Sequence, residues 1–148
     1  MFEFSTRRFF VAVLAAAVVA GLPGCGPGYE IAEVEGVVKV DGKPLSRAAV
    51  EFHPDPDAGT HGPYSVAETD EDGRYTLRYA IPAKAAAGRK DGVVVGKHKV
   101  LVLDLWAATD AGAGRLRFAS DYTQLATTPL TREVRPGKQT IDLELSAK

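Results

Sequence analysis

Few side chains of this 148-residue chain could do covalent or metal chemistry. The three histidines, His53, His61 and His98, share no predicted helix and lack the close pairing that a catalytic zinc site needs. His53 and His61 flank an acidic, proline-rich stretch that could gather a metal ion, but such stretches are more often solvated connections. No serine has a base beside it in the sequence. We therefore predict no metal or other cofactor and no catalytic residue, with a hydrolase as the least favoured alternative.

The single cysteine, Cys25, carries the strongest chemical signal. Two arginines precede an uncharged run over residues 9–22, which is the order of a cleavable export signal. That run is shorter than the ~20 apolar residues needed to span a bilayer. We therefore expect a helical signal peptide over residues 1–24, cut between Gly24 and Cys25.

The tetrad Leu22-Pro23-Gly24-Cys25 resembles the lipobox of bacterial lipoproteins, with Pro23 where most such boxes carry Ala or Ser. The resemblance implies that Cys25 carries a diacylglyceryl group and begins the mature chain. The alternative is a plain signal peptide cut elsewhere, with Cys25 free or buried. Lipidation is favoured because it accounts for an unpaired cysteine in an oxidising compartment. Gly26 then favours the outer membrane, facing the periplasm, by resemblance to sorting in other bacteria, while the arginines leave twin-arginine export open.

The composition of the mature chain excludes one class of partner. Without residues 1–24 the chain has 124 residues, with 16 basic side chains (18 less two arginines) and 18 acidic ones (19 less Glu3). That length suits a single domain with a core of its own. A near-neutral chain without a basic block lacks the electrostatic footprint of a nucleic-acid binder. We expect one domain and no nucleic-acid partner.

Alternation of apolar and polar residues begins at Glu33, and Asp41-Gly42 predicts a hairpin turn. We expect residues 25–32 to be the lipidated cysteine and a short linker, and residues 33–148 to be the folded domain. Short runs bounded by Gly, Pro or Asp recur through that domain. They predict an all-β fold, an antiparallel β-sandwich of about seven strands at 33–40, 48–53, 64–69, 74–79, 97–103, 131–134 and 140–145.

The strand and turn motifs resemble the carboxypeptidase regulatory-like domain, a transthyretin-type sandwich. They are Val34-Glu35-Gly36-Val37-Val38, Asp41-Gly42-Lys43-Pro44-Leu45, Ala49-Val50-Glu51-Phe52 and Thr69-Asp70-Glu71-Asp72-Gly73-Arg74-Tyr75-Thr76-Leu77. The later motifs resemble a lipoprotein branch of that family in planctomycete-type bacteria: Gly96-Lys97-His98-Lys99-Val100, Tyr122, Thr128-Pro129-Leu130-Thr131 and Val134-Arg135-Pro136-Gly137-Lys138. The resemblance implies a fold and no activity, because the family's peptidase activity belongs to a separate catalytic domain.

One of these motifs also has a metal-binding alternative. The stretch from Asp70 to Gly73 superficially resembles the start of a calcium loop. Arg74 and Tyr75 then occupy positions that need a ligand and a glycine, and the twelfth position is the apolar Ile81. A hairpin turn is therefore predicted here in place of a calcium site.

The remaining class of function is binding. The candidate surfaces are the two longest stretches without a strand pattern, residues 80–92 and 104–120. Trp106 and Tyr122 are the candidate binding residues, because exposed aromatics on sandwich loops could stack on a sugar ring or anchor a protein. Trp106 could instead close one end of the core, and Tyr122 is expected to be bonded to the backbone at a strand corner. The sequence thus predicts a non-catalytic envelope protein, held on the membrane through lipid on Cys25, that binds an unknown envelope protein; binding of an envelope polysaccharide is the alternative.

Overall fold

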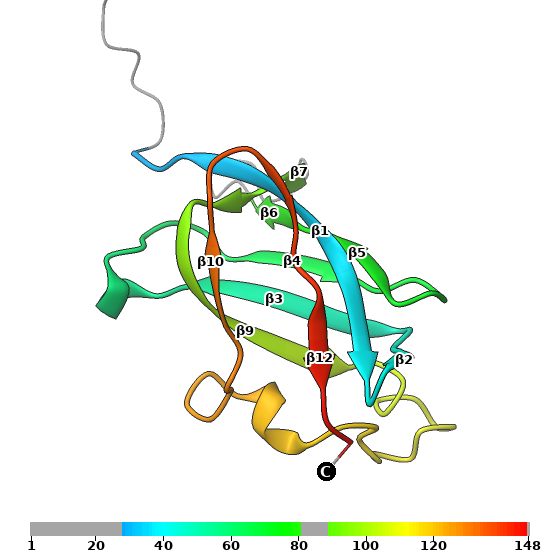
Figure 1. Cartoon of the computed structure of the whole chain (residues 1–148). Coiled ribbons are helices and arrows are strands. Elements are labelled where there is room, and N and C mark those ends of the chain that lie inside the picture. The colour runs from blue at the N-terminus through cyan, green and yellow to red at the C-terminus, as the bar shows by residue number, and fades with distance from the viewer. Residues whose placement is uncertain (1–27, 81–88, 148) are drawn as a thin grey trace, which may run out of the picture.

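The structure is a computed structural model that describes residues 28–80 and 89–147. Apart from two short 3-10 helices, η1 (Pro56–Ala58) and η3 (Ser120–Thr123), every regular element in this part is a strand. The strands form two sheets that pack face to face (Figure 1), so the predicted all-β sandwich is confirmed. Gly24, Cys25 and the predicted signal helix lie outside the described residues.

The first sheet is built around β1 (Ile31–Val40), which has strand partners along both sides. Its burial alternates as the sequence predicts, with Val34 and Val38 in the core. Five strands pair with it: β2 (Lys43–Pro44), β5 (Arg74–Thr76) and β8 (Val93–Val94) run antiparallel, whereas β11 (Lys138–Thr140) and β12 (Leu143–Leu145) run parallel. The two parallel pairings are exceptions within the predicted antiparallel sandwich.

The second sheet contains only antiparallel pairs among the described residues. Its centre is β3 paired with β9 over seven residues. In spatial order its strands are β10 (Thr131–Val134), β9 (Gly96–Asp104), β3 (Ala48–Pro54), β4 (Ser65–Glu68), β6 (Arg78–Ala80) and β7 (Arg89–Asp91).

Two of the crossings between the sheets fall at buried residues. The run at 74–79 was predicted as one strand, but β5 pairs with β1 and β6 pairs with β4, and the switch falls at the fully buried Leu77. The return switch falls at Gly92, whose N–H donates to the Leu77 carbonyl at 2.9 Å. Gly92 has φ +127°, and a Cβ there would lie 2.3 Å from Ile31 Cγ2. Only glycine fits this crossing without strain.

The predicted strand at 140–145 is also divided. β11 and β12 pair with different parts of β1, and the Ile141 N–H between them donates to the Glu35 carbonyl. The Ile141 carbonyl accepts the buried Tyr75 hydroxyl. At the same point β1 carries Gly36, where a Cβ would lie 2.0 Å from the Ile141 carbonyl oxygen. Close approach of the two backbones explains the glycine inside the strand.

The core lies between the two sheets and is capped by the segment that leads to η3. Phe52 and Phe118 are its largest fully buried side chains, and Leu77 and Leu143 pack with them. Asp41 and Gly42, at φ 47° and 80°, turn the chain from β1 into β2 as predicted. The two sheets therefore share one core, which fits a single domain.

Of the two predicted loops, residues 104–120 contain no strand beyond the end of β9. The prediction was wrong for residues 80–92, because the described part of that range includes β7 and the region leads into β8. β7 is charged at every residue and too short for its pairing with β6 to be visible as a sequence pattern. The number of strand segments therefore exceeds the predicted seven.

Candidate functional site

The segment from Asp104 to Thr123, termed the loop segment, carries both predicted binding residues. It leaves the end of β9 and crosses the end of the sandwich where β1 terminates at Val40 (Figure 1). Its backbone is tied to that end, because the Leu105 N–H donates to the Arg47 carbonyl and the Ala119 N–H to the Ser146 carbonyl, both at 3.1 Å. We call this the distal end, and the end where β1 begins at Ile31 the proximal end.

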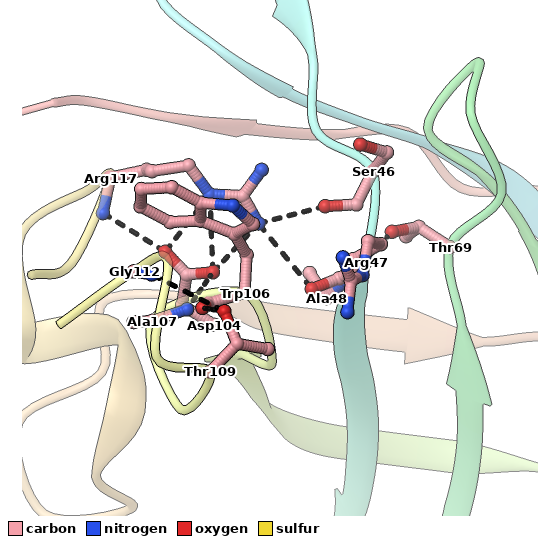
Figure 2. Close-up of polar contacts among 10 residues, drawn as sticks. All are labelled: Ser46, Arg47, Ala48, Thr69, Asp104, Trp106, Ala107, Thr109, Gly112 and Arg117. Atoms are coloured by element: carbon pink, nitrogen blue, oxygen red, sulfur yellow. Dashed lines mark hydrogen bonds and ion pairs between the residues drawn. The ribbon is translucent and has the colours of Figure 1, made fainter. Parts of the chain in front are cut away.

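A buried ion pair fixes the loop segment. Asp104 is the last residue of β9, on the inward-facing side, and its side chain is fully shielded from solvent. Arg117 Nη2 lies 2.6 Å from Asp104 Oδ1, and Arg117 Nε lies within 3.1 Å of both carboxylate oxygens (Figure 2). The same Nη2 of Arg117 also donates a hydrogen bond to the Ser46 carbonyl at 2.8 Å. The pair therefore joins the loop segment to the β2–β3 connection.

The carboxylate of Asp104 also accepts two backbone hydrogen bonds, from the N–H groups of Ala107 at 3.3 Å and Arg117 at 3.0 Å. Burial by itself raises the pKa of Asp104, but the hydrogen bonds and charge of Arg117 outweigh burial and hold the pKa below its usual value. The Asp104 carboxylate is therefore charged and fully paired at neutral pH. Its role is structural.

Trp106 lies against this ion pair, and it is only partly buried. The guanidinium carbon of Arg117 is 5.5 Å from the centroid of the indole ring, in a cation–π contact (Figure 2). The Trp106 carbonyl accepts the Thr109 hydroxyl at 2.7 Å. A Cβ at Gly112 would lie 2.1 Å from the Trp106 carbonyl oxygen, so the turn after Trp106 is tightly packed. One face of the indole thus already has a partner within the protein.

Tyr122, on η3, has different neighbours. Its ring packs edge-on against the core residue Phe118 at 6.2 Å between centroids, and its hydroxyl accepts the Ser146 N–H at 3.3 Å. These contacts attach η3 to the end of β12. Although one loop segment carries both Trp106 and Tyr122, no hydrogen bond or aromatic contact joins their described side chains.

The solvent-facing side of the loop segment is partly apolar. Leu116 is 37% exposed, and Leu125, just beyond η3, is 42% exposed. Leu116 also lines a shallow pocket, together with Phe118 and Ala119 from the loop segment and the first residues of η3. Sequence reasoning did not single out either leucine, because neither falls in an alternating run.

The three histidines lie in three different environments. His53 is on the outer face of β3, where its ring stacks on Tyr64 and its Nε2 lies 2.8 Å from a Glu51 carboxylate oxygen. His61 is exposed in the connection before β4. His98 is fully buried; its Nδ1 bonds to the Gly96 carbonyl and its Nε2 has no partner. Across residues 28–80 and 89–147, no three metal-binding side chains form a cluster.

A small cavity of about 140 Å³ opens at the proximal end where the chain changes sheets. Glu33, Glu35 and Asp91 line it, and Lys138 Nζ lies 3.2 Å from a Glu35 oxygen.

The predicted turn at Asp70 is formed as a hairpin, since the Asp70 carboxylate accepts the N–H groups of Asp72 and Arg74 at 3.0 and 2.8 Å. The Asp70 oxygen is therefore engaged in the turn.

Comparison with known proteins adds little to this geometry. No protein-family model and no curated protein matches the chain. A solved structure, chlorocatechol 1,2-dioxygenase from Pseudomonas putida, matches with 21% identity and a TM-score of 0.33. The match covers 80% of this chain and 60% of the dioxygenase chain. Among the described residues there is also no helix long and apolar enough to cross a membrane.

Proposed function

We propose that this protein is an exported, lipid-anchored envelope protein whose carboxypeptidase regulatory-like, transthyretin-type sandwich binds a second envelope protein without catalysing a reaction. Support for the anchor is the resemblance of residues 22–25 to a lipobox. Support for the binding role comes from the position of the loop segment. β1 has ten residues, so about 33 Å separates its ends. The loop segment thus lies at the opposite end of the sandwich from Ile31, where β1 begins.

The observation that carries the proposal is that an exposed apolar surface lies on a pinned loop. Leu116 immediately precedes Arg117, whose ion pair with the buried Asp104 holds the loop backbone. A loop that is already ordered loses less conformational entropy when a partner binds. Leu116 and Leu125 supply the apolar contact that the centre of a protein interface requires.

Trp106 favours a protein partner over a polysaccharide. Sugar rings bind aromatic residues by stacking on an open ring face, and Arg117 already lies over the indole. Tyr122 is held against Phe118 and Ser146. The two aromatic residues that the sequence offered for stacking therefore each have partners within the protein.

The test is crosslinking in living cells through a photoreactive residue at position 116 or 125, with position 133 on β10 as an exposed control. Captured partners and the lipid mass on Cys25 are both read by mass spectrometry. We expect one dominant protein captured from positions 116 and 125. Capture from position 125 should be lost in Leu116→Asp and kept in Trp106→Phe. An unmodified Cys25 contradicts the anchor. Retention on envelope polysaccharide that Trp106→Ala abolishes supports the carbohydrate alternative.

A further inference from the structure

An exposed aromatic side chain lies far from the loop segment, on the outer face of the second sheet. Tyr64, just before β4, is 47% exposed, and its ring stacks on that of His53 with centroids 5.1 Å apart and planes within 3°. The Glu51 carboxylate is 2.8 Å from His53 Nε2 and fixes the imidazole from the other side. Tyr64 therefore presents one ring face to the protein while nearly half of its surface faces solvent.

The connection that carries Tyr64 packs against the start of the described chain. A Cβ built on Gly62 would lie 3.4 Å from the Tyr29 ring, so Tyr29 lies directly on this connection. The next residue, Glu30, is held by a hydrogen bond, because its carbonyl accepts the Val95 N–H at 2.9 Å. Tyr64 is thus near the proximal end, where the chain leaves the sandwich toward Cys25.

The distance between this end and a lipid on Cys25 is bounded by the sequence. Tyr29 lies four positions after Cys25, and a fully extended chain spans at most ~3.6 Å per residue. Tyr29 therefore lies within about 14 Å of an anchored Cys25. A lipid on Cys25 would place the Tyr64 connection beside the headgroup layer.

We propose that the Tyr64–His53 stack is a membrane contact, with the Tyr64 ring in the headgroup layer of a phospholipid surface. This inference rests on the proposed lipid anchor. Tyrosine is suited to that layer, because its ring is apolar while its hydroxyl stays hydrated. The contact fixes how the sandwich stands on the membrane and directs the loop segment away from it.

Charge contributes little to this contact. The exposed residues of the same end include acidic Glu30 and Asp57 and basic Lys97, so the signs are mixed. A surface without a basic excess gains little from anionic lipids. The contact of Tyr64 with the membrane should therefore persist when the salt concentration rises, whereas contacts between exposed charges are screened.

The test uses the full, naturally processed chain reconstituted in vesicles of phosphatidylethanolamine and phosphatidylglycerol. Cys25 is the only cysteine, so a lipidated chain has no free thiol and an introduced one is labelled alone. An environment-sensitive dye is placed on His61→Cys, three residues from Tyr64, and on Leu125→Cys at the distal end as the matched control. Emission and quenching by brominated lipids are compared at low and high salt.

We expect the dye at position 61 to shift to the blue and to be quenched at both salt concentrations, with both effects reduced by Tyr64→Ala and retained in Tyr64→Phe. The dye at position 125 should report water. Protein that floats with the vesicles while both dyes report water overturns the membrane contact and leaves the anchor intact. Protein that does not float refutes the anchor and this inference together. Protection of position 61 by cell-wall polysaccharide in place of lipid assigns the stack to a glycan and overturns the proposal.

Discussion

Replacing Arg117 by alanine is expected to lower the free energy of unfolding by about 3 kcal/mol. The Asp104 side chain is fully buried, so the substitution leaves a buried carboxylate without its cation. Breaking such a pair typically costs ~3–5 kcal/mol. The lower end applies because Arg117 is 29% exposed and Asp104 keeps hydrogen bonds from two backbone N–H groups. In a domain of this size the loss corresponds to a fall in Tm of roughly 10 °C.

The chain supplies a matched control for this experiment. Arg78 and Asp91 form an ion pair with the same closest N–O distance of 2.6 Å, but both side chains are more than half exposed. An exposed pair contributes less than about 1 kcal/mol. Urea unfolding at neutral pH should therefore separate Arg117→Ala from Arg78→Ala, although the two substitutions remove the same chemical group.

The pH dependence checks the mechanism. In Arg117→Ala the buried Asp104 gains most by becoming neutral, so its pKa should rise above the usual value. The difference in stability between the wild type and Arg117→Ala should then shrink as the pH falls toward ~4. Equal urea midpoints for the two arginine variants, or a stability difference that does not change with pH, would refute the reasoning.

Two further predictions concern the core. Burial lowers the pKa of His98, although its hydrogen bond to the Gly96 carbonyl acts in the opposite direction. As the pH falls below the ordinary histidine pKa of about 6.5, the unfolded chain therefore binds the proton before the folded chain does. Stability is complete above that pH and should fall by up to ~1.4 kcal/mol per pH unit below it. Urea midpoints at pH ~7.5 and ~5.5 measure the loss of stability. His98→Leu should remove the part of this loss that comes from protonation of His98. Equal losses in the wild type and in His98→Leu would contradict the prediction. Gly36→Ala forces a Cβ onto the Ile141 carbonyl and should cost ~1–3 kcal/mol in thermal unfolding, whereas Gly28→Ala, with open space around it, should be neutral. Similar melting temperatures for these two alanine variants would contradict the close approach.

Much of the fold could be predicted because it depends on local patterns. The alternation of β1 and the turn at Asp41-Gly42 are both readable in the sequence. The change of sheet at Leu77 cannot be read from the sequence, because an alternating run has the same pattern whether its two halves pair with one strand or with two different strands. The parallel pairing of β12 with β1 joins residues more than 100 positions apart, and no local pattern encodes it.

The candidate site was only partly predictable for a related reason. Trp106 and Tyr122 were found by residue type, but the ion pair that positions the loop was missed. A signal for it exists in β9, where Asp104 occupies the same inward phase as Val100 and Val102. A carboxylate at a core position requires a cation or several donors. The sequence does not show that Arg117, thirteen residues later, provides them.

The pairing of β1 has a mechanical consequence. β1 is the first strand of the part of the chain that the structure describes, and its partners β11 and β12 lie at the other end of that part and run in the same direction. Opposed pulls on the two ends of the chain would slide β1 along these neighbours, so the hydrogen bonds between them would be loaded in shear and share the force. A strand at the edge of a hairpin would instead be peeled away one bond at a time. The order of these strands suits a domain that is pulled by its N-terminal end while it holds a load.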